Sequence, residues 1–390
     1  MSTRREVRLF EGEAPHVRAA PPSAAFLDVL AERLAIDLAD PDDPFALADA
    51  TVLLPNRRAV RGLIDAFAAR APGAGLLPAI KPLGDLDDDP DMWGPAALDL
   101  AIPPAIDPLR RRLHLAALLR RRDVAEGGAP DPVRAIAAAD ELAKLLDAAS
   151  ASDGVDWSKL AGLVEDRDLA AHWRRSVDFL EIVAQYWPLH LAEAGLSDPG
   201  ERRNLRLDAL AAAWTAQPPR GPVVIAGSTG SLPAVRRLMR VVANLPRGAV
   251  ILPGLDADLD DAAWAALGPQ HPQYGLRATL EALGVARMDV PVLAGATEDA
   301  SARARRVLVR EALVPADATA DWLARLARAG GEALASEALA GLSRVAAETE
   351  DEEACVIALA LRAALETPGK TAALVTPDAG LARRVAAKLV

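Results

Sequence analysis

Short apolar runs alternate with amphipathic segments along much of this chain, a pattern typical of an α/β fold. The clearest instance runs from Pro222 to Asp256. It comprises the apolar run PVVIA, a turn of small residues GSTGS, a helix that starts at Pro233 and a second apolar run AVILPGLD. Two β-branched runs joined by one helix predict a βαβ unit whose parallel strands are buried on both faces. Nucleotide-binding domains are built around such units.

The same alternation occurs before this unit. Strands are predicted at Val7–Phe10, Ala50–Leu54 and Leu76–Leu83, and helices at Pro22–Leu38, with Ser23 as N-cap, and at Ala59–Arg70. Between residues 104 and 217 the pattern is helical only, with Pro, Gly and Asp-Gly breaks between the helices. We expect helices there at Pro108–Arg122, Pro132–Ala149, Trp157–Leu163, Leu169–Glu193 and Glu201–Ala216.

After the central unit, helices are predicted around Trp264 and at Leu276–Leu283. A final group of elements comprises a strand at Leu342–Glu348, a helix at Glu352–Leu365, a strand at Thr371–Val375 and a helix at Gly380–Leu389. We therefore predict an α/β domain from residues 1–103 and 218–290, interrupted by an all-α insert at 104–217. A helical linker at 291–341 and the start of a second α/β domain at 342–390 follow, and we expect the chain to continue in a longer protein.

Composition limits the partners. The net charge is −11, so any contact with nucleic acid has to be a local basic patch. The single cysteine, Cys355, excludes a disulfide within the chain and any site built from several thiolates. No apolar run approaches the length of a spanning helix, and residues 1–20 have no apolar core of a signal peptide. We expect a cytoplasmic protein with no membrane contact.

Phosphate- and metal-binding chemistry is missing where this fold would place it. The segment EGEAPHVRAAPPS, between the first predicted strand and helix, has one Gly and no Lys. The GSTGS turn offers Ser228 and Thr229 where a triphosphatase needs carboxylates for magnesium. Gly369-Lys370-Thr371 follows a helix and precedes a predicted strand, the reverse of a phosphate loop. The acidic stretch at 84–91 has no His or Glu to complete a metal-ligand set and is interpreted as a solvated turn. The stretch at 256–261 lacks the ligand pattern of a calcium loop, and HPQYGL at 271–276 is interpreted as a structural turn.

Two groups of basic residues are candidates for phosphate contact. Pro55-Asn56-Arg57-Arg58 joins a strand to a helix, where backbone N–H groups favour anions, although a capped turn with solvated arginines explains the same residues. In the insert, three arginines at 110–112 and three at 120–122 accompany the aromatic residues Trp173, Phe179, Tyr186 and Trp187. Such residues clamp single strands, but aromatic residues of a helical insert also form its core.

Five segments together resemble one family. They are LLPNRRAVRGLIDAF at 53–67, PVVIAGSTGSLPAV at 222–235, AVILPGLD at 249–256, HPQYGL at 271–276 and KTAALVTPDAGLARRVAAKL at 370–389. In this order they resemble the N-terminal part of AddB, the helicase-like and nuclease subunit of the bacterial AddAB complex for double-strand-break repair. The resemblance implies a RecA-like, superfamily 1 helicase-like parallel sheet with an all-α insert and the start of a second RecA-like domain.

The resemblance also implies roles for residues. Asn56, Arg57 and Arg58 match a helicase segment that touches the DNA backbone, and Ser228 and Thr229 match the small-residue turn of the family. We therefore take these five as candidate DNA-binding residues, with no catalytic, cofactor or metal residue. The implied partners are single- or double-stranded DNA and an AddA-like helicase–nuclease subunit. Magnesium and an iron–sulfur cluster are implied only for a C-terminal nuclease region that this sequence does not contain.

These observations favour a motor-like fold that no longer hydrolyses ATP and that binds and scans single-stranded DNA, including the Chi sequence, beside the AddA-like motor. One alternative is an active ATP-binding helicase domain with a non-standard phosphate loop. Another is a module that docks the AddA-like subunit without touching DNA.

Overall fold

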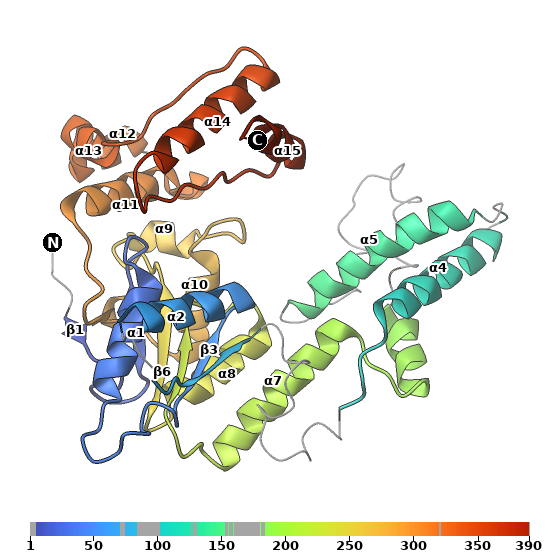
Figure 1. The fold of residues 1–390 in the computed structure, drawn as a ribbon. Coiled ribbons are helices and arrows are strands. Elements are labelled where there is room, and N and C mark those ends of the chain that lie inside the picture. The colour runs from blue at the N-terminus through green and yellow to red at the C-terminus, as the bar shows by residue number, and fades with distance from the viewer. Residues whose placement is uncertain are drawn as a thin grey trace.

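The computed structural model describes residues 5–70, 75–83, 102–125, 127, 131–152, 155, 159, 180, 184–319 and 321–389. Figure 1 shows an α/β domain, a helical insert (teal to green) beside it, and the C-terminal helices (orange to red) above it. The strands are β1 (Glu6–Val7), β2 (Val17–Ala20), β3 (Thr51–Leu54), β4 (Ala79–Pro82), β5 (Val223–Ala226), β6 (Gly248–Pro253) and β7 (Val292–Leu293).

The helices of the α/β domain are α1 (Phe26–Asp37), α2 (Arg57–Arg70), α8 (Pro233–Ala243), α9 (Asp261–Ala265) and α10 (Tyr274–Leu283). The insert contains α4 (Pro108–Ala125), α5 (Pro132–Ser150), a helical segment over residues 184–193, and α7 (Pro199–Ala216). The C-terminal helices are α11 (Ala300–Ala312), α12 (Trp322–Ala329), α13 (Gly331–Ala338), α14 (Glu350–Leu365) and α15 (Ala379–Leu389).

The seven strands form one sheet in the order β1-β7-β2-β6-β5-β3-β4, and every pairing is parallel. The chain runs outward from β2 to β3 and β4, and then returns through β5 and β6 to β7. The direction of winding therefore reverses after β4, and helices that connect the two halves lie on opposite faces of the sheet. The predicted α/β class with a parallel sheet is confirmed, and the sheet is consistent with a RecA-like fold.

Alternating side chains of the strands fill two hydrophobic cores. On β5, Val223 and Ile225 pack with α7, α8 and α10, whereas Val224 and Ala226 pack with α1 and α2. These four side chains are at most 1% exposed. Burial on both faces explains why the central strands read as continuous apolar runs in the sequence.

The strand that leads into α1 is β2, which we did not predict from the sequence. Its residues are VRAA, with an arginine and two alanines where a buried strand usually has β-branched residues. Arg18 is nevertheless 4% exposed, because its guanidinium donates to the backbone carbonyls of Arg8, Glu11 and Val17. Burial lowers the pKa of Arg18. The predicted strand Val7–Phe10 is wrong except at Val7, because β1 covers only Glu6–Val7 and the chain turns at residues 9 and 10.

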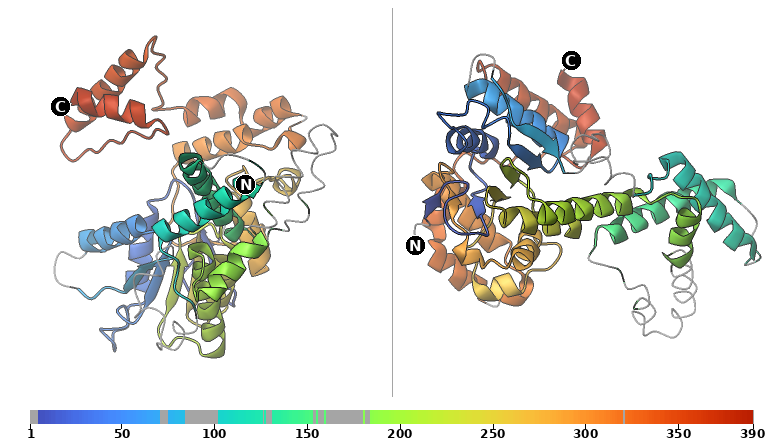
Figure 2. Two further views of the ribbon diagram at one scale, coloured as in Figure 1. Left: turned by 90° about the vertical axis from the view of Figure 1, so that its right-hand side faces the viewer. Right: turned by 90° about the horizontal axis from the view of Figure 1, so that it is seen from below.

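Helix α7 joins the insert to the sheet. Its C-terminal half contributes Leu207 and Leu210 to a core of the α/β domain, and its N-terminal end contacts the insert (Figure 2). The insert has a core of its own, which includes Leu115, Ala139 and Trp187. Trp187 thus has the core role that was one of the two interpretations of these aromatic residues, whereas Tyr186 is 44% exposed. The predicted helix 157–163, except for residue 159, lies outside the described residues, as do Trp173, Phe179 and the acidic stretch 84–91.

Helices α14 and α15, both predicted from the sequence, pack on each other through Ala354, Ala358, Leu381 and Val385. The strands predicted at 342–348 and 371–375 are wrong, because neither segment takes part in a ladder. Val375 is 94% exposed. An apolar run becomes a strand only when another strand pairs with its backbone, and none among the described residues does so here. No helix in the described part of the chain has the length and hydropathy needed to cross a membrane.

Candidate functional site

The loops that follow β2, β3, β5 and β6 lie together at the carboxyl edge of the sheet. A Cβ atom added to Gly227, after β5, would stand 3.2 Å from Phe26 and 3.7 Å from Pro55. A Cβ atom on Gly254, after β6, would stand 3.5 Å from Pro22. Ligands of open parallel sheets bind at this edge, where the direction of winding reverses. The edge is therefore the candidate site.

The first candidate group, Asn56, Arg57 and Arg58, lies where β3 ends and α2 begins. The side-chain oxygen Oδ1 of Asn56 accepts a hydrogen bond of 2.9 Å from the amide of Ala59, so Asn56 caps α2. All three side chains are exposed. The structure therefore fits the interpretation of a capped turn with solvated arginines, and phosphate contact by these residues stays a prediction.

The second candidate pair, Ser228 and Thr229, is held in a tightly bonded turn. Ser228 is buried, and its hydroxyl accepts a bond of 3.2 Å from the amide of Gly230, whose φ of +64° requires glycine. The carbonyl of Thr229 accepts a bond of 2.8 Å from the hydroxyl of Thr279. The exposed member of the pair is Thr229. The side chain of Thr229 is therefore accessible at the edge, while Ser228 holds the turn together.

The loop between β2 and α1 consists only of residues 21–25, PPSAA. It is shorter than the thirteen-residue segment in which we looked for a phosphate loop, because β2 occupies part of that segment. Two of its residues are prolines, which have no N–H to donate. The amide of Ala24 already donates to the carbonyl of Pro21, and the hydroxyl of Ser23 donates to Glu298. Such a loop is poorly suited to surround a polyphosphate.

Acidic residues after β6 pair with arginines of α11. Arg310 Nε donates to Asp256 Oδ2 at 2.7 Å, and Arg306 lies between Asp256, Asp258 and Glu298. Nε and Nη2 of Arg306 bond the Glu298 carboxylate at 3.1 to 3.2 Å. Burial opposes the charge of Arg306, but the hydrogen bonds and charge of Glu298 outweigh it and raise the pKa of Arg306. We call these five residues the α11 ion-pair network.

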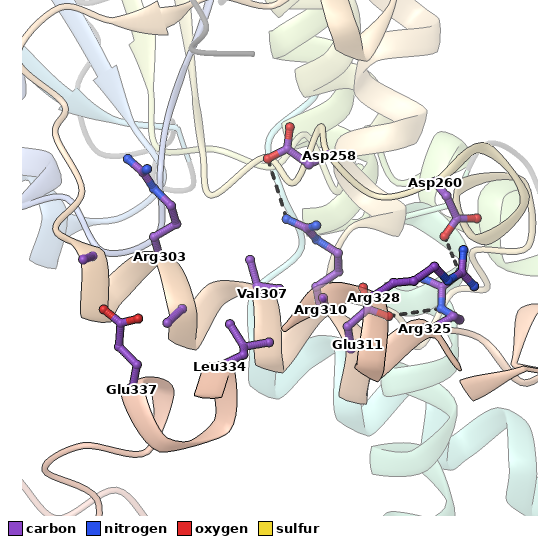
Figure 3. Close-up of a pocket in the computed structure, with 13 residues that line it drawn as sticks. Asp258, Asp260, Arg303, Val307, Arg310, Glu311, Arg325, Arg328, Leu334 and Glu337 are labelled. Atoms are coloured by element: carbon purple, nitrogen blue, oxygen red, sulfur yellow. Dashed lines mark hydrogen bonds and ion pairs between the residues drawn. The ribbon is translucent and has the colours of Figure 1, made fainter. Parts of the chain in front are cut away.

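A second set of ion pairs joins the same loop to α12. Arg325 bonds Asp260 at 2.6 Å and Glu311 at 3.1 Å (Figure 3). Asp260 also caps α9, because its carboxylate accepts the amide of Ala263 at 2.9 Å. The acidic stretch 256–261 is therefore a cap and a partner for arginines. No group of three or more His, Cys, Asp or Glu side chains suited to a metal ion occurs among the described residues.

The HPQYGL segment is a structural turn, as interpreted from the sequence. Nδ1 of His271 accepts a bond of 3.1 Å from the amide of Gln273. The side chain of Gln273 bridges the amide of Asp256 and the carbonyl of Gly254, each at 2.9 Å. Burial lowers the pKa of His271, so the ring stays neutral near pH 7. The turn fixes the loop that follows β6.

Two cavities adjoin α11. One, of about 660 Å³, lies between α11, α12 and α13, and its lining includes Arg303, Arg328 and Glu337 (Figure 3). The other, of about 600 Å³, lies at the carboxyl edge and includes Ser23 and Thr229. We call the second cavity the edge pocket. Sequence reasoning missed α11 as part of the site, although the crowding of arginines at 303, 305, 306 and 310 in an Ala-rich stretch was a signal for it.

The basic groups of the insert are only partly available. Arg111 is buried and bonds Asp198, whereas Arg120 and Arg121 are exposed. The exposed pair lies on α4, which belongs to the insert, so it is separate from the carboxyl edge. Arg120 and Arg121 are therefore suitable control positions for the candidate DNA-binding residues at the edge.

Comparison with known proteins gives no family: no family model matches this chain, and no curated protein matches it.

Proposed function

We propose that this chain is a helicase-like, AddB-like DNA-binding unit that has no ATPase activity of its own and that holds single-stranded DNA beside an AddA-like motor. The observation that carries the proposal is the contrast between two neighbouring loops of the carboxyl edge. The β3 loop presents Arg57 and Arg58 at a helix N-terminus, while the β2 loop is the proline-containing PPSAA. The edge is thus equipped for backbone phosphates and not for a triphosphate.

The charge distribution supports a local contact. The chain carries a net charge of −11, so its overall field repels DNA. Arg57 and Arg58 lie in the first turn of α2, which has no acidic residue in that turn. The positive end of the helix dipole adds to their charge. Contacts of this kind position a strand and do not read its bases.

We expect the double substitution Arg57→Ala and Arg58→Ala to weaken binding of a labelled single strand. Each phosphate contact on a single strand contributes about 0.7 to the slope of log K against log salt, so the slope should fall by about 1.4. Fluorescence anisotropy at several salt concentrations measures both quantities. Asn56 is left in place because its cap stabilises α2 by about 1 kcal/mol.

The matched control is Arg120→Ala with Arg121→Ala, which removes the same charge from exposed positions of the insert. We expect this control to lose less affinity for the single strand than the variant with Arg57→Ala and Arg58→Ala. Equal losses would show that DNA responds only to total charge, and unchanged binding in both variants would remove the β3 loop from the account. A wild-type protein that binds the AddA-like subunit but no DNA would favour the docking alternative.

A further inference from the structure

The edge pocket has a chemistry that the proposed backbone contacts do not use. Its volume of about 600 Å³ lies in the range of pockets for small molecules. Its walls are mainly apolar and include three proline rings, those of Pro22, Pro253 and Pro272, together with Leu276 and Val309. Rings and aliphatic side chains of this kind pack against the face of a flat, apolar group.

The charged residues that line the edge pocket differ in their pairing. Arg306 and Arg310 are neutralised by Asp256, Asp258 and Glu298 within the α11 ion-pair network. Arg305 instead donates to two backbone carbonyls, those of Ala338 at 3.0 Å and Ala340 at 2.7 Å. Among the described residues, no carboxylate forms an ion pair with Arg305. Arg305 is therefore the arginine of the pocket that has no carboxylate partner, and it lies beside apolar walls.

The apolar walls and Arg305 together determine which class of ligand fits the edge pocket. A triphosphate brings several negative charges, and only one of the arginines that line the pocket, Arg305, has no carboxylate partner among the described residues. A nucleotide unit within a DNA strand has a flat base and a single negative charge on its phosphodiester. Thr229, an exposed candidate for DNA contact, also lines the pocket and connects it to the turn after β5.

We propose that the edge pocket receives one unstacked base of a DNA single strand, with Arg305 on the adjacent phosphodiester. This inference rests on the proposed function, because it names a subsite for the same strand. Base stacking supplies affinity that does not depend on salt, whereas Arg305 supplies a salt-dependent part. The two parts can therefore be measured separately.

The test compares an oligothymidylate with an abasic oligomer of the same length and charge. The wild-type chain should bind the oligothymidylate about tenfold more tightly, the effect of burying one base face against the apolar walls of the pocket. Val309→Trp narrows the pocket from a position on α11 that is 49% exposed, so the core is left intact. In Val309→Trp, the preference for the oligothymidylate over the abasic oligomer should shrink toward equal binding. Val133→Trp, at an exposed position on α5, should keep it.

Arg305→Gln should lower the salt slope by about 0.7 for both oligomers, whereas Arg303→Gln, on the same helix at the other cavity, should not. Thermal melting confirms that each variant is folded. A preference that survives Val309→Trp, or an equal slope change in the two arginine variants, would overturn the proposal. Equal wild-type binding of the two oligomers would also overturn it while leaving the proposed DNA function standing. No wild-type binding of either oligomer would overturn both.

Discussion

Arg306→Ala should lower the free energy of unfolding by about 3 kcal/mol. The carboxylate of Glu298 is 8% exposed and receives three hydrogen bonds from Arg306, so the substitution leaves a buried charge without its main partner. Removing one member of a buried pair is far more costly than the net value of the pair, because desolvation of the other member remains. Chemical denaturation followed by far-UV circular dichroism measures the loss.

Arg303→Ala is the matched control for Arg306→Ala. Arg303 lies on the same helix and 3.9 Å from the same carboxylate, but it is 53% exposed. We expect a loss of no more than about 0.5 kcal/mol, as for a pair at the surface. Equal effects of the two substitutions would show that the α11 ion-pair network does not hold α11 to the carboxyl edge.

Asp198→Ala should destabilise the helical insert by about 3 to 5 kcal/mol. The Asp198 carboxylate is bonded by Arg111 Nε at 2.9 Å, by Arg111 Nη2 at 3.1 Å and by Trp187 Nε1 at 3.1 Å. It also caps α7 through the amide of Gly200. The substitution leaves the buried Arg111 guanidinium without its buried carboxylate partner, and the indole N–H of Trp187 without its acceptor. Hydrogen exchange of amides in α4 and α5 reports the stability of the insert.

The control is Asp147→Ala. Asp147 bonds the same guanidinium at 2.9 Å, but its side chain is 55% exposed. A loss below about 1 kcal/mol is expected there. Because the insert has its own core, amides of β5 and β6 should keep their protection in Asp198→Ala. If these strands lose protection together with the insert, the insert and the sheet unfold as one unit.

The sequence was sufficient to predict the centre of the fold. Strands β5 and β6 are apolar on both faces, and the proline at the start of α8 and the small residues before it mark the turn between them. The same reasoning missed β2, because Arg18 is buried through bonds to carbonyls that no local pattern reveals. It wrongly predicted strands at 342–348 and 371–375, where apolar residues were present but no strand in the described part of the chain pairs with them. A strand needs a pairing strand that is often distant in the sequence, whereas a helix depends less on distant partners.

In the candidate site, too, local features could be predicted from the sequence and contacts between distant residues could not. The position of Asn56 and Arg57 at a strand end and a helix start could be predicted, since both elements are local. The pairing of Arg310 with Asp256 spans 54 residues and could not be predicted. Nor could the burial of Ser228, which depends on how the turn packs. The DNA-binding and partner roles of the chain, and its lack of a cofactor, remain predictions.

The most direct test of the account is thermal melting of the chain with either ligand. A ligand that binds the folded state raises the melting temperature, by an amount that corresponds to about 2.7 kcal/mol at a hundred times its Kd. With a single-stranded oligonucleotide at increasing concentration, we predict a progressive rise. With millimolar Mg-ATP, we predict no rise, because the PPSAA loop and the GSTGS turn lack the groups that hold a triphosphate and its metal. A rise with Mg-ATP and none with DNA would contradict the account.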